Sequence, residues 1–443
     1  MTAPHGNHSD RTITQLLAKV ADYLDTITGS LTILTGNVLR VDKSGTDGAQ
    51  PAGRWDLPFL TIQAAVTAAA SGDTIVIGPG TFTENVLIPN TRTSQHFVGA
   101  GMLSTVMTAN GAGNTLSWIS VGAVMTRLTI RNLTLTAGAG SGLIVNADLG
   151  TTSFDDGADG RNGLFLDNVY LSGAAAATLT AVNNVVMTNC IVAAAAPFFF
   201  THCSQTNLRN TQFGAVTFSY VAGGNKPSRA LRNKNLFNCL LVSLTVDKLD
   251  NAVCDPDCVV TGNIVTTVAD DAGLWPTAFS LEFHGTCQGN MSLGHTFTIA
   301  PQNAFLCDRC KLVGTLLTPG VGGQRSTVNF RNAVLYASGG GNISAGNFSD
   351  LDLIGAQFSH TAGVLVAAGT GTCNRSIHRE AISLVIAPLG VVFAVPFTDN
   401  LYTVIYETTI AATDVLTNPK AATGFTATSA AVDANASFCV VHQ

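Results

Sequence analysis

The sequence contains unusually few charged residues. Only 11% of its 443 residues are charged, and the formal net charge is −6; an ordinary soluble domain has roughly 25% charged residues. The chain is 46% hydrophobic, which excludes the charged, apolar-poor composition of a disordered protein. Nothing forms the basic footprint of a nucleic-acid-binding protein, so we expect no nucleic-acid partner. So few charges predict that partners, above all copies of the same chain, cover much of the surface.

Long apolar runs and a leader sequence are also missing. Among the most apolar stretches, Val185–Ala196 contains Thr and Asn and is too short to cross a bilayer, so no membrane insertion is expected. The first residues, Met1-Thr-Ala-Pro-His-Gly, lack the basic and apolar regions of a signal peptide. The ten cysteines are therefore expected to be reduced thiols rather than a disulfide framework.

The N-terminal region shows an unbroken 4-3 spacing of apolar residues. The positions are Ile13, Leu17, Val20, Leu24, Ile27, Leu31, Leu34 and Val38. This is the seam of a heptad repeat, and the order of leucine and isoleucine in it favours three strands or more. A helix packed on its own domain is the alternative, and Gly29 and Gly36 weaken the later turns.

A short amphipathic helix followed by a strand is expected after residue 43. Ile62, Ala65, Val66 and Ala69 form the apolar stripe of the helix. Thr74–Ile77 is then the first strand, and Phe82, Val86 and Ile88 continue the coil after a Pro79-Gly80 turn. The segment Thr61–Ile88 resembles the entry segment of pectate-lyase-like right-handed parallel β-helix proteins. That resemblance implies a helix that covers the open end of the first coil.

An asparagine repeat follows the entry segment. Each asparagine lies beside an apolar strand, at Asn132, Asn168, Asn189, Asn210, Asn238, Asn263, Asn290 and Asn332, and the same position is assigned to Cys310 and Gly355. A period of 20 to 30 residues with alternating apolar positions is typical of a β-solenoid; chance spacing in a β-sandwich is the alternative. Asparagine tolerates the left-handed backbone of a corner, and stacked amides can hydrogen-bond. Leu166, Val186, Phe213 and Leu240, which flank these corners, are expected to point inward.

The last part of the chain carries hairpin signals instead of the repeat. Strands are expected at Ile382–Ile386, Val391–Val395, Tyr402–Tyr406 and Phe438–Val441, with turns at Asp399-Asn400 and Asn418-Pro419. The run Val392–Val404 and the later Thr423-Gly-Phe-Thr resemble the small antiparallel β-domains that tip phage tail fibres. The predicted fold class is therefore all-β, a right-handed parallel β-helix built as a single-stranded solenoid. An N-terminal anchor and coiled-coil helix (1–42) precedes the β-helix (43–375), and a small C-terminal antiparallel β-sandwich tip (376–443) follows it.

Catalytic candidates are few. Glycoside cleavage needs two carboxylates on either side of the bond, and the best cluster is Asp155, Asp156 and Asp159 in a glycine-rich stretch, with a solvated loop as the alternative. Glu282 and His284 alternate on one strand face and could act as an acid and a base, although a solvated strand face explains them too. The row of aspartates and the arginine of a pectate lyase calcium site are not found, so the resemblance carries over the fold and not the activity.

Metal and sugar sites have weaker support. Cys307-Asp-Arg-Cys310 and Cys254-Asp-Pro-Asp-Cys258 could each supply half of a zinc site. Cysteines placed by a coil repeat are more often core residues, so no metal and no cofactor are expected. In the tip, Phe397, Asp399, Asn400, Tyr402 and Tyr406 combine aromatic and polar groups that suit sugar binding. Burial of Tyr402 and Tyr406 in the tip core is the alternative.

Together these features favour a non-enzymatic structural spike or fibre of a phage virion, made in the host cytoplasm and forming a homotrimer. Its N-terminus would bind other virion proteins, and its tip would contact a receptor or glycan on the host surface. A polysaccharide-degrading tailspike, either a glycoside hydrolase or a polysaccharide lyase, is the first alternative. A secreted β-helix adhesin is the second.

Overall fold

The computed structural model describes most of the chain between residues 36 and 313 and the strands beyond. The described ranges are 36–48, 54–119, 126–146, 163–203, 205–219, 233–247, 251–267, 281–293, 302–313 and, further on, strand segments from 316–318 to 435–442. The predicted coiled coil at residues 13–34 lies outside them. Among the described residues, no helix is long and apolar enough to cross a membrane.

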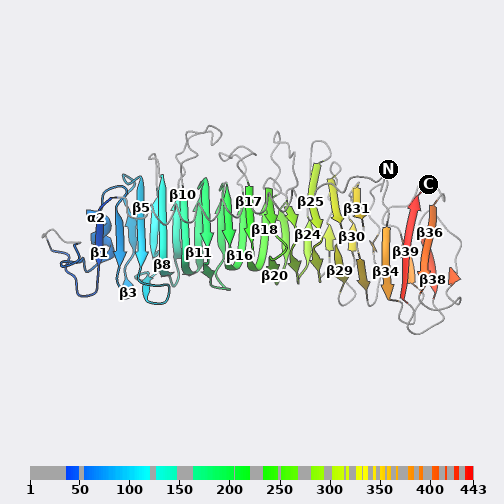
Figure 1. Ribbon diagram of the computed structural model, residues 1–443, viewed down its shortest axis with the longest axis horizontal. Helices are drawn as coiled ribbons and strands as arrows, with labels where there is room; N and C mark the ends of the chain where they lie inside the picture. The colour runs from blue at the N-terminus through cyan, green and yellow to red at the C-terminus, as the bar shows by residue number, and fades with distance from the viewer. Residues whose placement is uncertain are drawn as a thin grey trace, which may run out of the picture.

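Three parallel sheets wind around one core, and together they form an elongated β-helix (Figure 1). Each coil contributes one strand to each sheet, and each strand pairs in parallel with its equivalents in the neighbouring coils. The predicted fold class is confirmed. The register of strand pairing divides the strands into the following sets.

Sheet 1 contains β1 (Val38–Val41), β2 (Thr74–Ile77), β5 (Ser94–Gly99), β8 (Arg127–Thr136), β10 (Gly163–Ser172), β12 (Asn184–Thr188), β15 (Thr206–Arg209), β17 (Asn233–Phe237), β19 (Asn251–Cys254), β22 (Leu281–Phe283), β25 (Gln302–Asp308), β28 (Ser326–Arg331) and β31 (Asp350–Ile354). Because β8 and β10 are long, their second halves continue into sheet 2.

Sheet 2 also contains β3 (Gly80–Thr83), β6 (Thr105–Thr108), β13 (Ile191–Val192), the first part of β16 (Gln212–Ser219), the first part of β18 (Leu240–Asp247), β20 (Val259–Val260), β23 (Thr286–Cys287), β26 (Lys311–Leu312), β29 (Val334–Ala337) and β32 (Gln357–His360).

Sheet 3 contains β4 (Val86–Ile88), β7 (Leu116–Ile119), β9 (Ser141–Asn146), β11 (Ala175–Thr180), β14 (Phe198–Thr201), the second parts of β16 and β18, β21 (Ile264–Thr267), β24 (Met291–Leu293), β27 (Leu316–Thr318), β30 (Ile343–Ala345) and β33 (Val366–Ala367).

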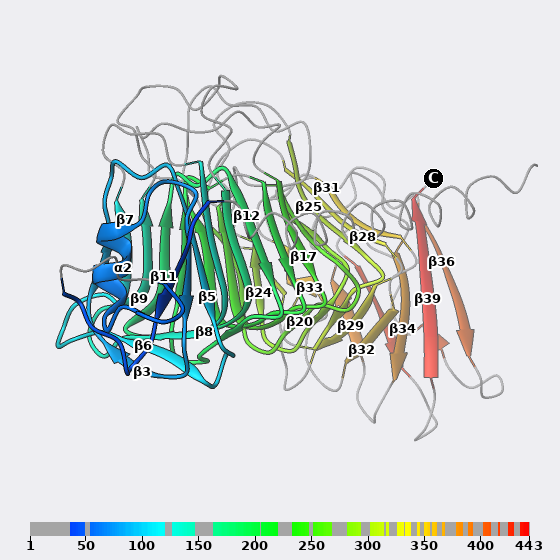
Figure 2. The same ribbon diagram turned by 60° about the vertical axis from the view of Figure 1, so that its left-hand side comes forward.

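The helix α2 (Ile62–Ala68) covers the open end of the stack at β1 (Figure 2). Its predicted apolar stripe, Ile62, Ala65, Val66 and Ala69, is fully buried. The Thr61 hydroxyl caps the helix by accepting from the Ala64 N–H. The Glu84 carboxylate accepts from the Ile62 and Gln63 N–H groups at 2.9 Å each. The predicted entry segment is confirmed, and Glu84 holds the cap to the first coil.

The start of the stack differs from the prediction at one point. Val38, expected as the last position of the heptad seam, lies in β1, which pairs with β2 from Val38↔Thr74 to Val41↔Ile77. Gly36, with φ +90°, precedes this strand. The heptad prediction is wrong at Val38, because pairing with a neighbouring strand outweighs the local helical spacing. The shaft therefore includes residues that were assigned to the anchor.

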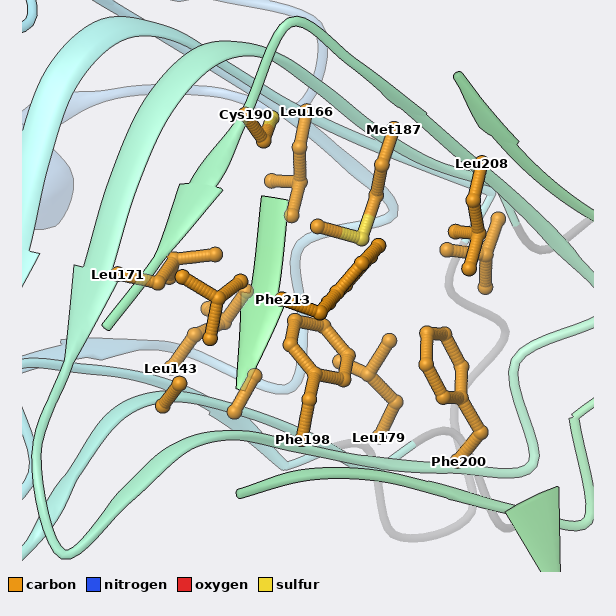
Figure 3. Packing of buried hydrophobic residues seen from close by; sticks show 14 of the residues in the cluster. Leu143, Leu166, Leu171, Leu179, Met187, Cys190, Phe198, Phe200, Leu208 and Phe213 are labelled. Atoms are coloured by element: carbon orange, nitrogen blue, oxygen red, sulfur yellow. The ribbon is translucent and has the colours of Figure 1, made fainter. Parts of the chain in front are cut away.

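The core is a stack of apolar side chains from all three sheets. Figure 3 shows Met187 and Leu208 from sheet 1, Phe213 from sheet 2, and Leu179 with Phe198 from sheet 3 pointing toward one another. Phe198 and Phe200 stack with their centroids 4.6 Å apart, and Phe200 stacks on Phe218 at 4.7 Å. Because each coil buries its apolar face on the next, stability builds up along the axis.

Left-handed residues form the corners between sheets 1 and 2. Asn132, Asn168, Asn189, Asn210 and Asn238 have φ of 54°, 55°, 54°, 47° and 48°. Amide hydrogen bonds connect several of them, from Asn168 Nδ2 to Asn132 Oδ1 at 2.9 Å and from Asn238 Nδ2 to Asn210 Oδ1 at 2.9 Å. The predicted asparagine ladder is confirmed between Asn132 and Asn168 and from Asn189 through Asn210 to Asn238.

The same geometry corrects three positions of the repeat. Asn263 and Asn290 precede β21 and β24, so they lie at the corner between sheets 2 and 3, where the Asn290 N–H donates to Asn263 Oδ1 at 2.9 Å. The corner before β26 is made by Arg309, with φ 61°, and not by Cys310. Spacing alone could not separate two corners of the same coil, which lie only a few residues apart. Asn332 and Gly355 lie outside the described residues.

Two of the four expected inward side chains point outward. Leu166 and Phe213 are buried, each with 1% of the side chain exposed. Val186 is half-buried and Leu240 is 41% exposed. Each of the two outward residues lies one position away from an inward one, next to Met187 and Leu241. A shift of one residue reverses the face of a strand, and this accounts for both errors.

The strands change from parallel to antiparallel after β33. One three-stranded sheet has the order β34 (His378–Ser383), β39 (Asn435–His442) and β36 (Tyr402–Thr408). A second has the order β35 (Leu389–Val392), β38 (Gly424–Thr428) and β37 (Val415–Leu416). These strands lie at the end of the molecule opposite α2 (Figure 1). The predicted antiparallel tip is confirmed, although its first two strands begin and end earlier in the chain than expected.

Candidate functional site

Only some of the predicted catalytic and sugar-binding residues lie in the part of the chain that the structure describes. Asp155, Asp156 and Asp159 lie outside the described residues, and so do Phe397, Asp399 and Asn400 of the predicted sugar site. Tyr402 and Tyr406 lie on β36, where they pair with His442 and Phe438 of β39. Their role in sugar binding stays a prediction.

Glu282 and His284 lie on the outer face of sheet 1, as their alternation predicts. Both are half-buried, and the residue between them, Phe283, is fully buried in the core. His284 Nδ1 lies 2.9 Å from the backbone oxygen of Asp308. A carbonyl oxygen only accepts hydrogen bonds, so Nδ1 carries the proton. Glu282 and His284 therefore share one outward face of the shaft, and their use in catalysis stays a prediction.

The cysteines line the core behind the corners between sheets 1 and 2. Cys190, Cys239, Cys258 and Cys310 each precede a strand of sheet 2 and are buried. Burial raises the pKa of the Cys190 thiol to about 12 and that of Cys287 to about 11, so these two thiols stay protonated. Their core placement agrees with the sequence interpretation.

One pair of cysteines contradicts the expectation of reduced thiols. Cys307 and Cys310 form a disulfide bond, with Cα atoms 5.7 Å apart. The tight corner at Arg309 brings the two side chains together inside the stack. Their sulfurs are therefore not available as half of a zinc site. In the part of the chain that the structure describes, no group of three or more His, Cys, Asp or Glu side chains is arranged to hold a metal ion.

A polar cluster on the outer face of sheet 1 was not predicted from the sequence. We define the basic cluster as His96 on β5 together with Arg127, Thr129 and Arg131 on β8. His96 and Thr129 are register partners on adjacent strands. Arg127 and Arg131 stand two residues to either side of Thr129, so all four side chains point outward from neighbouring positions. Although they face outward, His96 is only 3% exposed and Thr129 is fully buried.

The charges of the basic cluster are not balanced. Arg131 Nε lies 3.7 Å from the carboxylate of Asp167 on β10. The guanidinium of Arg127 instead lies over the ring of Phe165, 4.5 Å from its centroid. Burial and the positive charges of Arg127 and Arg131 lower the pKa of His96 to about 4. At neutral pH the cluster therefore contains two cations and an uncharged imidazole, and the Asp167 carboxylate beside it pairs with only one of the cations.

The basic cluster could not be recognised from the spacing of its residues along the chain. Arg127 and Arg131 alternate with Leu128 and Ile130, which are buried, and this is the ordinary pattern of a strand with one solvated face. His96 belongs to the preceding coil. Only the parallel register brings these side chains together, and the unequal lengths of the coils conceal that register in the sequence. A sequence signal that could have helped is the presence of two arginines on one strand in a chain with so few charges.

Comparisons with known proteins add little. No protein-family model matches the chain, and no curated protein matches it in sequence. Among solved structures, a pectin methylesterase from carrot is similar, with 13% sequence identity, a TM-score of 0.21, and coverage of 74% of this chain and 82% of that one. A rhamnogalacturonan lyase is similar with 11% identity, a TM-score of 0.17, and coverage of 73% and 74%. Similarity this low carries no conclusion about the activity of this chain.

Proposed function

We propose that the protein is a structural spike or fibre of a phage particle, attached by its N-terminal region and reaching the host with its C-terminal tip. The observation that carries the proposal is the long parallel β-helix that separates the α2 end from the antiparallel sheets (Figure 1). In a solenoid each coil contacts only its neighbours, and the outcome is a stiff rod. A rod of this kind holds its two ends apart, which is what a particle needs to contact a surface at a distance.

The two ends of the rod differ in a way that agrees with this role. At the β1 end, a helix closes the core, with Thr61 and Glu84 holding its first turn. At the other end, the parallel coils give way to two antiparallel sheets that stretch over residues 378–442. Capping a solenoid requires only a few residues. Two additional sheets at the far end therefore favour a further role, and we assign them contact with a host receptor or glycan.

The proposed partners are two further copies of the chain and other virion proteins. Support for self-association comes from the low charge of the sequence, from the heptad seam, and from apolar side chains on the outer face of the shaft. Among these side chains, Ile191, Leu240 and Val242 are 38%, 41% and 40% exposed. Ile191 and Leu240 lie in one outward row of sheet 2, with Gln212 between them in the register. Packing such a row against a partner would remove its apolar surface from water.

Imaging of phage particles tests the proposal directly. Virions would be labelled with antibodies raised against residues 378–442 and viewed by electron microscopy. We expect label on the particle surface, at the free ends of rod-shaped projections. Unlabelled particles, despite a positive control with purified protein, would contradict the proposal.

A polysaccharide-degrading tailspike is the second candidate, and one observation favours it. Glu282 and His284 lie on the same outer face of the shaft, as described above. Incubating the full chain with host polysaccharide and measuring new reducing ends separates the two functions. Release of reducing ends by the unmodified protein, but not by Glu282→Gln, would favour the enzyme. No release by either protein favours the structural role.

A further inference from the structure

Unpaired polar atoms gather in the basic cluster. In the described residues, the side-chain atoms His96 Nδ1, Thr129 Oγ1, Arg127 Nε and Arg131 Nε are buried and make no hydrogen bond. Their side chains come from two adjacent strands of sheet 1. A buried polar atom without a hydrogen-bond partner is unfavourable, so four such atoms in one place need an explanation. Arginine over phenylalanine accounts for the position of Arg127 alone, and it leaves the Nε–H group unused.

The chemistry of these atoms favours an oxyanion as the missing partner. The two Nε–H groups only donate, and the hydroxyl of Thr129 donates as well as accepts. Arg127 has no carboxylate within ion-pair distance among the described residues. The carboxylate of Asp167 compensates one of the two cations, at the Arg131 side. One positive charge therefore remains, and charge-assisted hydrogen bonds from arginine to an oxyanion are the strong ones.

Phe165 narrows the class of ligand. Its ring is half-buried on the outer face of sheet 1, next to Thr129 in the register. Aromatic rings beside a few fixed polar groups suit the apolar face of a sugar. We propose that the basic cluster and Phe165 bind the carboxylate and the ring of an acidic sugar, at a site on the shaft that is separate from the tip. The charged group pairs with Arg127, and the sugar ring lies along Phe165.

Binding of a small acidic sugar to the full chain tests the site. The probe is D-glucuronate, with D-glucose and inorganic sulfate as comparison ligands, measured by calorimetry at low salt. We expect glucuronate to bind, and Arg127→Gln and Arg131→Gln each to weaken it by tenfold or more. Arg40→Gln is the matched control, because Arg40 lies on the same sheet but is paired with Asp42 at 2.8 Å. This control is expected to bind as the unmodified protein does.

The protonation of His96 provides an independent measurement. His96 faces Arg127 and Arg131 of β8, uncharged Thr74 of β2 and, one strand further, Asp167 of β10. A bound carboxylate favours the imidazolium form, so we expect affinity to rise as the pH falls from 7 to 5. His96→Gln should make the affinity nearly independent of pH over this range. An NMR titration of the His96 ring should show its pKa move upward when glucuronate is added.

The outcomes are distinct. Equal binding of glucuronate and glucose would overturn the proposal. Unchanged glucuronate affinity in the Arg127 and Arg131 variants would also overturn it, provided that thermal melting shows the variants to be folded. Sulfate binding as tight as glucuronate binding would show that the site recognises charge alone, which overturns its assignment to a sugar. None of these results depends on the tip, so failure here leaves the proposed spike function intact.

Discussion

Single residues in left-handed backbone take the chain from sheet 1 to sheet 2. Asn189 is typical, with φ 54° and an exposed side chain whose Oδ1 accepts from Asn210 Nδ2 at 3.4 Å. The hydrogen bond is long and solvated, so the backbone conformation is the stronger reason for asparagine. Of the two reasons that the sequence offered for asparagine, tolerance of left-handed backbone therefore outweighs the stacking of amides at this corner.

Replacing this asparagine should distinguish the two explanations. We expect Asn189→Leu to lower the free energy of unfolding by about 1–2 kcal/mol, the usual cost of left-handed backbone for a residue with a Cβ. Asn189→Gly, which removes the amide but adopts this backbone freely, should cost less. Urea or thermal unfolding measures both. If the glycine variant is the less stable of the two, the amide ladder stabilises this corner more than the backbone conformation does.

His96 should make the shaft sensitive to acid. Its pKa is about 4 in the folded chain and about 6.5 in an unfolded one. Because the folded-state pKa is lower, the unfolded state binds the proton more readily. The resulting stability is fully present above pH 6.5 and is lost as the pH falls toward 4, by up to about 3 kcal/mol.

The comparison of the native protein with His96→Gln isolates this effect. Unfolding free energies would be measured for both without ligand at several pH values between 7 and 4. We expect the difference between the two proteins to change in favour of the glutamine variant as the pH falls. Two parallel curves would mean that the pKa of His96 is the same in the folded and unfolded chains, which contradicts the expected acid sensitivity.

Strand β14 shows how alternation sorts side chains in one element. Phe198 and Phe200 are buried in the core, with 0% and 1% exposed, while Phe199 between them is half-buried on the outer face. Phe200 stacks between Phe198 and Phe218. Three consecutive identical residues therefore have two different surroundings, which makes this strand a controlled comparison.

Truncation of these phenylalanines should have unequal effects. Phe200→Ala leaves a cavity among rings that cannot close in, and we expect it to lower the free energy of unfolding by about 3–5 kcal/mol. Phe199→Ala, the matched control, should cost far less, because water already reaches that side chain. Chemical denaturation of both variants measures the difference. Similar losses in the two variants would mean that the outer face of β14 is covered in the folded protein.

Elements were more predictable from the sequence than the register between them. The entry helix could be located because its apolar stripe and the strand after it are local patterns. The corners at Asn168 and Asn189 could be located because one residue type meets a backbone requirement. Asn263 and Asn290 were assigned to the wrong corner, since two corners of a coil use the same residue. Contacts between coils, such as His96 with Thr129, depend on loop lengths that no local pattern encodes.

At the scale of the whole molecule, self-association has two separate sources of support. The heptad seam predicts a coiled coil of three helices, one from each chain. Exposed apolar side chains such as Leu240 lie on the outer face of sheet 2. We expect sedimentation or native mass spectrometry to give three times 45.8 kDa. Leu24→Asn and Ile27→Asn should loosen the N-terminal end first, since buried unpaired amides cost about 1–3 kcal/mol each. A stable monomer at micromolar concentration would exclude the trimer.

The proposed function depends on whether the antiparallel tip binds the host or only caps the β-helix. Because β34 lies beside β32 of the last coils, the antiparallel sheets also close the end of the solenoid, and closing it is their simplest role. A role in host contact requires that the shaft without them be unable to bind cells. Because the tip is also a candidate for aligning the chains of the proposed trimer during folding, only a truncated protein shown to be trimeric is informative.

Binding of a truncated trimer to host cells is therefore the most direct measurement. The full chain and a protein lacking residues 377–443 would be compared for attachment to host cells, and for attachment through their N-termini to particles that lack the protein. We predict that the truncated trimer still joins the particle but no longer binds cells. A truncated trimer that binds cells as well as the full chain would contradict the account and would leave the tip with capping alone.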